Sequence, residues 1–286
     1  METDFHTPAA HAPTARLGKI PWWALILMAG GLIILYQILA SPDYKATFIF
    51  IKNGVIVTLR ITMIAFPIST LIGLFVGLLR TSKSTFLFTI STLYVEIIRG
   101  IPLVVLILMV AFGIIPLFVE LVNALGAWGV SHFSSGVLNS FFESMLEFSI
   151  RSISMELRAI IALAIGYGAF EAEIFRAGIQ SISKGQMEAA RSLGMSYIQS
   201  MRFIILPQAV RRVLPPLGND FIAMLKDSSL ATVLAVNELT QLTRIRRAST
   251  FRVMEAFNIA AFLYLAMTLL LSAAVRLLEQ KMKIEE

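Results

Sequence analysis

The sequence has 286 residues, of which 57% are hydrophobic and only 15% are charged, and its mean hydropathy is +0.79. A soluble domain of this length needs far more charge, so the composition excludes one and indicates a helical protein that crosses a membrane several times. The absence of cysteine excludes disulfides and thiolate metal sites, and three scattered histidines argue against a metal centre. The net charge of +6 is typical of a cytoplasmic excess of Lys and Arg, and we expect no nucleic-acid partner.

The amino-terminal part predicts a polar tail and one membrane-spanning helix. Residues 1–20 are polar, with prolines and alanines, and read as a disordered cytoplasmic tail that carries Arg16 and Lys19. We assign 21–41 to an additional transmembrane helix, whose apolar run from Trp22 to Ala40 starts with an interfacial tryptophan pair. This run is too long for a signal-peptide core and has no clear cleavage site. Residues 41–52 should connect on the far side.

Two further spans and an insertion are expected next. The second span covers Gly54–Leu79, where Gly73 and Gly77 are read as close-packing positions, and ends at a basic loop. The third, Phe86–Leu117, is too long for a straight crossing and should kink at Pro102. Residues 120–156 mix small and polar residues with isolated carboxylates, which predicts an external insertion with one or two surface helices.

The remaining pattern completes a six-helix topology with both termini in the cytoplasm. The fourth, fifth and sixth spans are predicted at Leu157–Ile179, Pro215–Val236 and Met254–Leu278, and a polar linker at 237–252 precedes the last span. Most basic residues then lie inside, as the positive-inside rule requires. Four arginines of the linker oppose this topology: Arg244, Arg246, Arg247 and Arg252.

The most informative stretch is the polar interruption at 181–211. Glu188 to about Ser200 favours a helix, and Gly194 allows the backbone to bend or approach a neighbour. Pro207 is typical of the first turn of a new helix, because its missing N–H is not needed there. A short helix, a turn and a second helix are therefore expected.

This stretch resembles the cytoplasmic loop of the membrane-spanning subunits of ATP-binding-cassette (ABC) importers. The family pattern is Glu-Ala-Ala, three residues, Gly, nine residues, Ile, one residue, Leu-Pro, and every position matches from Glu188 to Pro207. The resemblance implies a coupling helix that docks into a groove on a separate ATPase subunit. The residues it assigns to this contact are Gln186, Glu188, Ala189, Ala190, Leu193, Gly194, Leu206 and Pro207. A surface helix between two spans is the plainer alternative.

The resemblance extends over 52–280, which it makes an ABC type-1 transmembrane domain. The run from Arg99 to Leu103 resembles the Arg-Gly-x-Pro-Leu motif of polar-amino-acid permeases, and 172–176 resembles their Ala-Glu-x-x-Arg segment. Residues 218–222 and 225–230 resemble their fifth-helix pattern. Leu106 stands where these permeases often have Gln, so contacts to the substrate are expected to differ from those of relatives.

Ionisable and polar residues inside the spans have two interpretations. They line a substrate path, with a carboxylate meeting an amino group and a cation meeting a carboxylate, or they pair with one another between helices. For any single residue pairing is favoured, notably Glu96 with Arg99 and Glu173 with Arg176, each three residues apart. The substrate-path candidates are Glu96, Arg99, Glu173, Arg176, Asn219, Asp220, Lys226 and Asp227.

The sequence therefore predicts an all-α permease subunit of the bacterial cytoplasmic (inner) membrane, which imports a polar amino acid by alternating access. No GxxxxGK[ST] loop is present, so the chain is not expected to be an enzyme or to hold a cofactor, and ATP and Mg would be bound by the partner ATPase. The resemblance further implies a second permease chain, identical or similar, an extracytoplasmic amino-acid-binding protein, and contact with membrane lipid. An ion-coupled secondary amino-acid transporter is the alternative, and a membrane-embedded enzyme is a more remote one.

Overall fold

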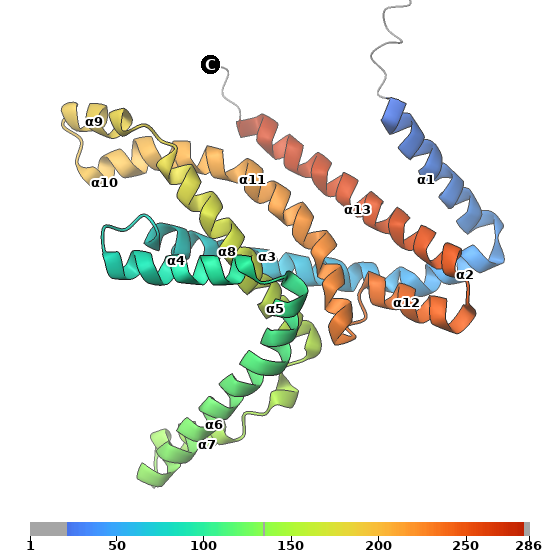
Figure 1. Ribbon diagram of the computed structural model, residues 1–286, viewed down its shortest axis with the longest axis horizontal. Helices are drawn as coiled ribbons and strands as arrows, with labels where there is room; N and C mark the ends of the chain where they lie inside the picture. Colours follow the sequence, from blue (N-terminus) through green and yellow to red (C-terminus); the bar gives the residue numbers. More distant parts are fainter. Residues whose placement is uncertain (1–21, 134, 283–286) are drawn as a thin grey trace, which may run out of the picture.

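A computed structural model describes residues 22–133 and 135–282, and every regular element in these ranges is helical (Figure 1). The expected all-α fold is confirmed. The predicted tail at 1–20, with Arg16 and Lys19, lies outside the described residues. The long α-helices are α1 (Trp22–Ala40), α3 (Asn53–Leu79), α4 (Thr85–Gly100), α6 (Ile115–His132), α8 (Met155–Gln180), α11 (Leu206–Asp227), α12 (Leu239–Thr250) and α13 (Val253–Met282). The shorter elements are α2 (Pro42–Ile51), α5 (Leu103–Met109), the π-helical turn η2 (Val110–Ile114), α7 (Val137–Leu146), the 3₁₀ turn η3 (Ile150–Ser152), α9 (Lys184–Ser192), α10 (Tyr197–Ser200), the π-helical turn η4 (Met201–Ile205) and the 3₁₀ helix η5 (Ser228–Leu234).

Four helical segments of the described chain are long and apolar enough to cross a membrane. They cover Trp22–Ala40, Pro42–Leu79, Leu103–His132 and Val253–Gln280. The helices α8 and α11, with 26 and 22 residues, are also long enough to cross but carry more ionisable side chains. The start of α1, the end of α13 and the α9–α10 loop lie toward the top of Figure 1, α12 lies at the right near mid-height, and the α6–α7 hairpin lies at the bottom.

Two predicted boundaries are corrected by the structure. Residues 42–51, expected as a connection, form the helix α2, which leads almost directly into α3. The expected third span is two helices, because Ile101 before Pro102 adopts an extended conformation (φ −97°, ψ 132°) and ends α4. The second helix then runs through α5, η2 and α6 to His132, so the first part of the expected 120–156 insertion continues a membrane helix.

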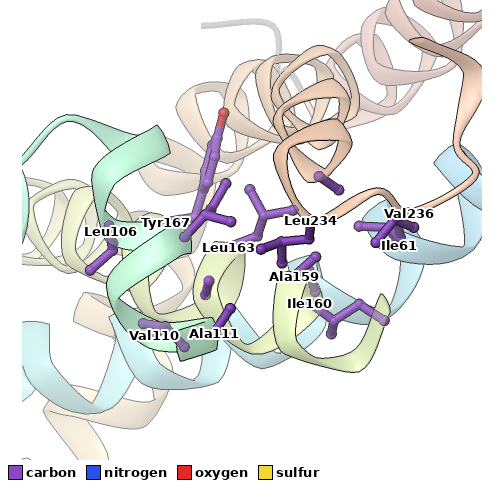
Figure 2. Packing of buried hydrophobic residues seen from close by; sticks show 14 of the residues in the cluster. Ile61, Leu106, Val110, Ala111, Ala159, Ile160, Leu163, Tyr167, Leu234 and Val236 are labelled. Carbon is purple, nitrogen blue, oxygen red and sulfur yellow. The ribbon is translucent and has the colours of Figure 1, made fainter. Parts of the chain in front are cut away.

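The largest buried cluster lies where α3, α5, α8 and η5 meet (Figure 2). Ile61 of α3, Leu106 of α5 and Leu163 of α8 are all fully or almost fully buried there, and Leu234 of η5 packs with them. Leu106, the residue that departs from the family pattern, is thus a core side chain in this protein. Its apolar side chain suits this position, where a Gln amide would need hydrogen-bond partners.

A buried arginine fixes the π-helical turn to α8. Arg158 donates to the carbonyl oxygens of Ala111 (2.9 Å), Ile150 (2.8 Å) and Ile153 (3.0 Å). Ala111 lies in η2, where a π-helical turn interrupts the ordinary α-helical ladder. The guanidinium thereby joins α8 to η2 and to the backbone after α7, a contact that the sequence analysis did not predict.

The helices α3 and α8 approach closely through glycines. A Cβ on Gly73 would lie 2.7 Å from the Cβ of Glu171, and one on Gly77 would lie 2.8 Å from the Cβ of Phe175. Both distances are too short for real side chains, so only glycine permits this crossing. The prediction that these glycines are close-packing positions is confirmed.

Replacement of Gly73 by valine is expected to destabilise the protein by about 3 kcal/mol, the upper part of the range for overpacking a core. The neighbours that would have to move are backbone and Cβ atoms of α8, which cannot rotate away. The melting temperature of the detergent-solubilised variant measures this loss. Gly30→Val is the matched control, because nothing lies within 4 Å of a Cβ at Gly30. Equal melting temperatures for the two variants would contradict the assignment.

The expected polar linker at 237–252 contains the helix α12, which is anchored by a buried carboxylate. Glu238 accepts hydrogen bonds from the backbone N–H groups of Thr240 and Gln241, both at 2.7 Å, and from the hydroxyl of Tyr264 at 3.1 Å. Burial raises the pKa of the Glu238 carboxyl, while these hydrogen bonds oppose the shift. A Cβ on Gly54 would lie 2.6 Å from the Cα of Leu239, so the start of α12 rests directly on α3.

Two of the linker arginines that oppose the expected topology have partners on α2. Arg252 forms an ion pair with Asp43, and the guanidinium of Arg246 lies over the ring of Phe50, 5.9 Å from its centroid. These contacts compensate part of the cost of placing arginines at this end of the molecule.

Candidate functional site

The helix α9 lies at the centre of the motif at 181–211 and is shorter than predicted. Ser183 caps it by accepting a hydrogen bond from the backbone N–H of Gly185 (3.2 Å), and the helix ends at Ser192. Gly194 then adopts φ +81°, a left-handed conformation that costs a residue with a side chain about 1–2 kcal/mol. The expectation that this helix continues to about Ser200 is therefore wrong, because the backbone reverses at Gly194.

The chain resumes as one long helical segment through α10, η4 and α11. Ser196 and Gln199 form a capping box at its start, at 2.8 and 3.3 Å. Pro207 lies in the first turn of α11 but does not follow a loop. Its missing N–H and its ring are accommodated by the π-helical turn η4 directly before it. The helical segment that contains the expected fifth span accordingly begins at Tyr197, well before Pro215.

The predicted coupling residues occupy two different environments. Ala190 is buried, and near it a small core of Ile182, Ile205 and Ala209 holds α9 against the start of α11. The Gln208 side chain on α11 also donates to that of Gln186 on α9 (3.3 Å). The exposed members of the predicted set are Gln186, Glu188, Ala189, Leu193, Gly194, Leu206 and Pro207.

An exposed apolar surface surrounds the turn at Gly194. Leu193 is 83% exposed and Ile198 is 75% exposed, and Tyr197 and Phe203 are also exposed. A shallow depression of about 350 Å³ lies on the same surface. Tyr197, Ile198 and Phe203 were not among the predicted contact residues, although large apolar residues in an otherwise polar loop are a signal that the sequence offers. A loop with this much uncovered apolar surface is suited to contact another protein.

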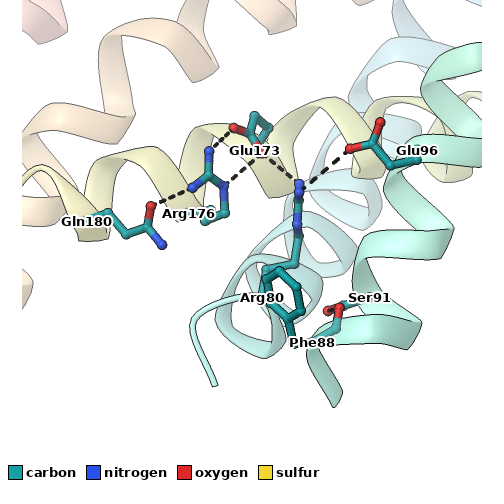
Figure 3. A network of polar contacts seen from close by, with 7 residues as sticks. All are labelled: Arg80, Phe88, Ser91, Glu96, Glu173, Arg176 and Gln180. Atoms are coloured by element: carbon teal, nitrogen blue, oxygen red, sulfur yellow. Dashed lines mark hydrogen bonds and ion pairs between the residues drawn. The ribbon is translucent and has the colours of Figure 1, made fainter. Parts of the chain in front are cut away.

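Three of the predicted substrate-path residues, Glu96, Glu173 and Arg176, lie around a junction of α3, α4 and α8 (Figure 3). The carboxylate of Glu173 accepts from Arg80 at the end of α3 (2.6 Å) and from Arg176 on its own helix (2.9 Å). The predicted Glu173–Arg176 pair is thus confirmed. The predicted Glu96–Arg99 pair is wrong, since Glu96 lies 3.8 Å from Arg80 instead. The helical turn between residues 96 and 99 allows pairing, but Arg80 lies between Glu96 and Glu173 and contacts both.

Arg99 has an aromatic partner in place of a carboxylate. Its guanidinium lies 5.7 Å from the ring centroid of Phe170 on α8, a cation–π contact. This contact joins α4 to α8 beside the Arg80–Glu173 pair. At this end of the molecule the ionisable residues therefore connect helices, as the pairing interpretation predicts.

The four predicted residues of α11 are divided between exposed and partly buried positions. Asn219 and Lys226 are exposed, whereas Asp220 and Asp227 are partly buried. The hydroxyl of Tyr167 on α8 donates to Asp227 at 2.8 Å. The eight substrate-path candidates therefore do not converge on one place.

A carboxylate that the sequence analysis did not select is the most deeply buried of this region. Glu171 on α8 is fully buried and accepts a hydrogen bond from the hydroxyl of Ser69 on α3 (2.8 Å). Among the described residues its Oε2 atom and the Oδ2 atom of Asp220 have no hydrogen-bond partner. A buried carboxylate oxygen without a hydrogen-bond partner is costly, and both of these oxygens keep the capacity to accept a hydrogen bond.

One cavity of the bundle is apolar. It has a volume of about 410 Å³ between α3, α8 and α11, and Thr70 is the only residue with a polar side chain in its lining. Such a lining suits hydrocarbon and not a polar solute, so this cavity is not the substrate site.

These features define a multi-pass helical membrane protein with an exposed loop at one end. Residues 69–284 match the family described as binding-protein-dependent transport system inner membrane component. The chain is 35% identical over 233 residues to the probable glutamine ABC transporter permease protein GlnP of Bacillus subtilis (strain 168), covering 80% of this chain and 92% of that protein. It is 34% identical over 232 residues to the glutamine transport system permease protein GlnP of Escherichia coli (strain K12), covering 81% and 92%.

The chain is also similar in fold to solved structures of ABC transporters. A crystal structure of an amino acid ABC transporter with histidines superposes with a TM-score of 0.65 at 34% identity, covering 85% of this chain and 97% of that one. An inward-facing MetNI methionine ABC transporter, at 18% identity and a TM-score of 0.58, shares the fold. The chain belongs to the binding-protein-dependent transport system inner membrane component family. It is a permease subunit of the cytoplasmic membrane and not an enzyme.

Proposed function

We propose that this chain forms the translocation path of an ATP-driven importer for a polar amino acid. The observation that carries the proposal is the α9 loop, whose exposed surface at Glu188, Leu193 and Gly194 lies at the end of the molecule away from α12 (Figure 1). The names of the glutamine permeases to which the chain is similar support the substrate class. An ATPase subunit that holds ATP and Mg, an extracytoplasmic binding protein and a second permease chain complete the proposed assembly.

The contacts around α9 suggest how motion would pass into the membrane. The end of α8 leads into α9 through Ser181–Ser183, and Arg212 on α11 donates to the carbonyl oxygen of Ser181. The small core at Ile182, Ile205 and Ala209 joins the same two helices. Displacement of α9 by an ATPase would therefore move α8 and α11 together. Those helices carry Glu171 and Asp220, so the movement would alter access to both carboxyl groups, as alternating access requires.

Purification of the tagged chain from its native membrane tests this proposal. We expect an ATPase subunit to co-purify, and we expect the reconstituted complex to accumulate labelled glutamine or another polar amino acid only with ATP and a binding protein. The competing hypothesis from the sequence, an ion-coupled carrier, predicts uptake by the chain alone under an ion gradient. Uptake of that kind, insensitive to ATP depletion, would overturn the importer assignment.

A further inference from the structure

The helix α7 presents an apolar surface that no described part of the protein covers. Val137 is 88% exposed, and Leu138 and Phe141 are more than half exposed, whereas none of the residues of α7 is buried. At 100° per residue these three side chains lie on one side of the helix, and Asn139 and Glu143 lie near the opposite side. The helix is thus amphipathic, with its apolar side turned away from the protein.

The orientation of α7 is fixed by tight packing against α6. A Cβ on Gly126 would lie 2.9 Å from the backbone N of Leu146, and a Cβ on Gly129 would overlap the ring of Phe142. The Phe142 ring also stacks on Phe133, with centroids 5.6 Å apart. One edge of the apolar face of α7 packs against α6. The other edge, with Val137, Leu138 and Phe141, therefore remains exposed.

This uncovered surface is continuous with a surface that faces lipid. The α6 helix belongs to the membrane-crossing segment Leu103–His132, and it exposes large apolar side chains, among them Leu121 and Leu125, beside α7. That segment has 30 residues and is about 45 Å long, which exceeds the roughly 30 Å of the hydrocarbon core. Its far end, with α7 packed on it, therefore reaches the headgroup region.

The aromatic residues at this end match a membrane interface. Trp128 on α6 is 53% exposed, stacks on His132 with centroids 4.6 Å apart, and meets the ring of Phe142 edge-on at 6.4 Å. Tryptophan is enriched at the boundary between hydrocarbon and water. In Figure 1 the α6–α7 hairpin projects from the bundle at the end away from α9 and α10.

We propose that α7 is an interfacial membrane anchor that inserts Val137, Leu138 and Phe141 into the lipid bilayer surface at the end of the protein opposite the α9 loop. The anchor holds the distal end of α6 at a fixed depth. Its attachment depends on apolar burial and not on anionic lipid, because the α7 segment 137–147 carries Glu143 and Glu147 but no lysine or arginine. This inference does not depend on the substrate or on the ATPase.

Site-directed nitroxide labelling tests the proposal. The natural sequence has no cysteine, so each single variant carries one label. Val137→Cys and Phe141→Cys probe the apolar side, and Asn139→Cys and Glu143→Cys are matched controls on the polar side of the same helix. The labelled full-length chain is measured in phosphatidylcholine vesicles with oxygen, which concentrates in lipid, and with a nickel chelate, which remains in water.

The expected result is a loss of nickel accessibility at residues 137 and 141, with high oxygen accessibility, and the reverse at residues 139 and 143. The pattern should be the same at low and high salt and with or without anionic lipid. Equal nickel accessibility at all four sites would overturn the proposal, because α7 would then lie in water. Shielding of residues 137 and 141 from both reagents would also overturn it and would indicate a protein occupant, either a second copy of the chain or an extracytoplasmic partner.

Discussion

Replacement of Glu188 by lysine is expected to abolish uptake while the protein remains folded in the membrane. Glu188 is exposed on α9, and its side chain forms no hydrogen bond or ion pair with the described residues, so the reversed charge should not disturb the bundle. Its expected effect falls on the docking of the ATPase, where a reversed charge at the contact costs several kcal/mol. The measurement is ATP-dependent uptake in vesicles together with the amount of ATPase that co-purifies.

The matched control is Glu147→Lys, the same charge reversal on an exposed glutamate near the far end of the molecule. It should retain uptake and the ATPase. If Glu188→Lys transports as well as Glu147→Lys, the α9 loop does not couple the two subunits. If Glu188→Lys loses its fold, which the melting temperature reveals, Glu188→Gln removes the charge with less disturbance and replaces it in the comparison.

Replacement of Glu173 by glutamine is expected to destabilise the protein by about 3 kcal/mol and to lower its melting temperature by several degrees. Glu173 is the shared partner of Arg80, whose side chain is only 9% exposed, and of Arg176. Without this carboxylate two guanidinium groups remain close together, and Arg80 keeps only its longer 3.8 Å contact with Glu96. Thermal unfolding of the detergent-solubilised chain measures the loss.

Glu96→Gln provides the comparison for this junction. The Glu96 side chain is 65% exposed, so its contribution should be within the range of a surface ion pair, about 0.5 kcal/mol. If the Glu96 variant is as unstable as the Glu173 variant, the Arg80 guanidinium relies on Glu96 as much as on Glu173. Glu173 is then not the main partner of Arg80 at this junction.

Local patterns were sufficient for the features that involve neighbours in sequence. The Glu173–Arg176 pair follows from a separation of three residues on one helix, and the break before Pro102 follows from the geometry of the residue that precedes proline. The motif from Glu188 to Pro207 likewise indicated the family before the fold was known. The motif did not indicate that α9 ends at Ser192, because Gly194 is compatible either with a bend in the backbone or with a helix that continues close to a neighbouring segment.

Contacts between distant residues could not be predicted in this way. The pairing of Arg80 with Glu173 spans 93 residues, and that of Ser69 with Glu171 spans 102. The carboxylates at 171 and 173, two residues apart, look alike in the sequence, yet one is fully buried against α3 and the other pairs at the surface of the junction. Their roles differ because helical residues two positions apart point about 200° apart, and only packing decides which direction faces a neighbour.

The sequence by itself determined that this protein is an all-helical membrane permease, because hydrophobic length and the spacing of the coupling motif are properties of the chain. The tertiary structure alone decided which charges meet, that Leu106 belongs to the core, and that α7 folds back on α6 with Val137 and Phe141 turned outward. These outcomes depend on close helix approach at glycines such as Gly73 and Gly129, where the absent side chain sets which helices touch. Which helices pack together depends on the shapes of both contacting surfaces, and a single stretch of sequence specifies only one of those two surfaces.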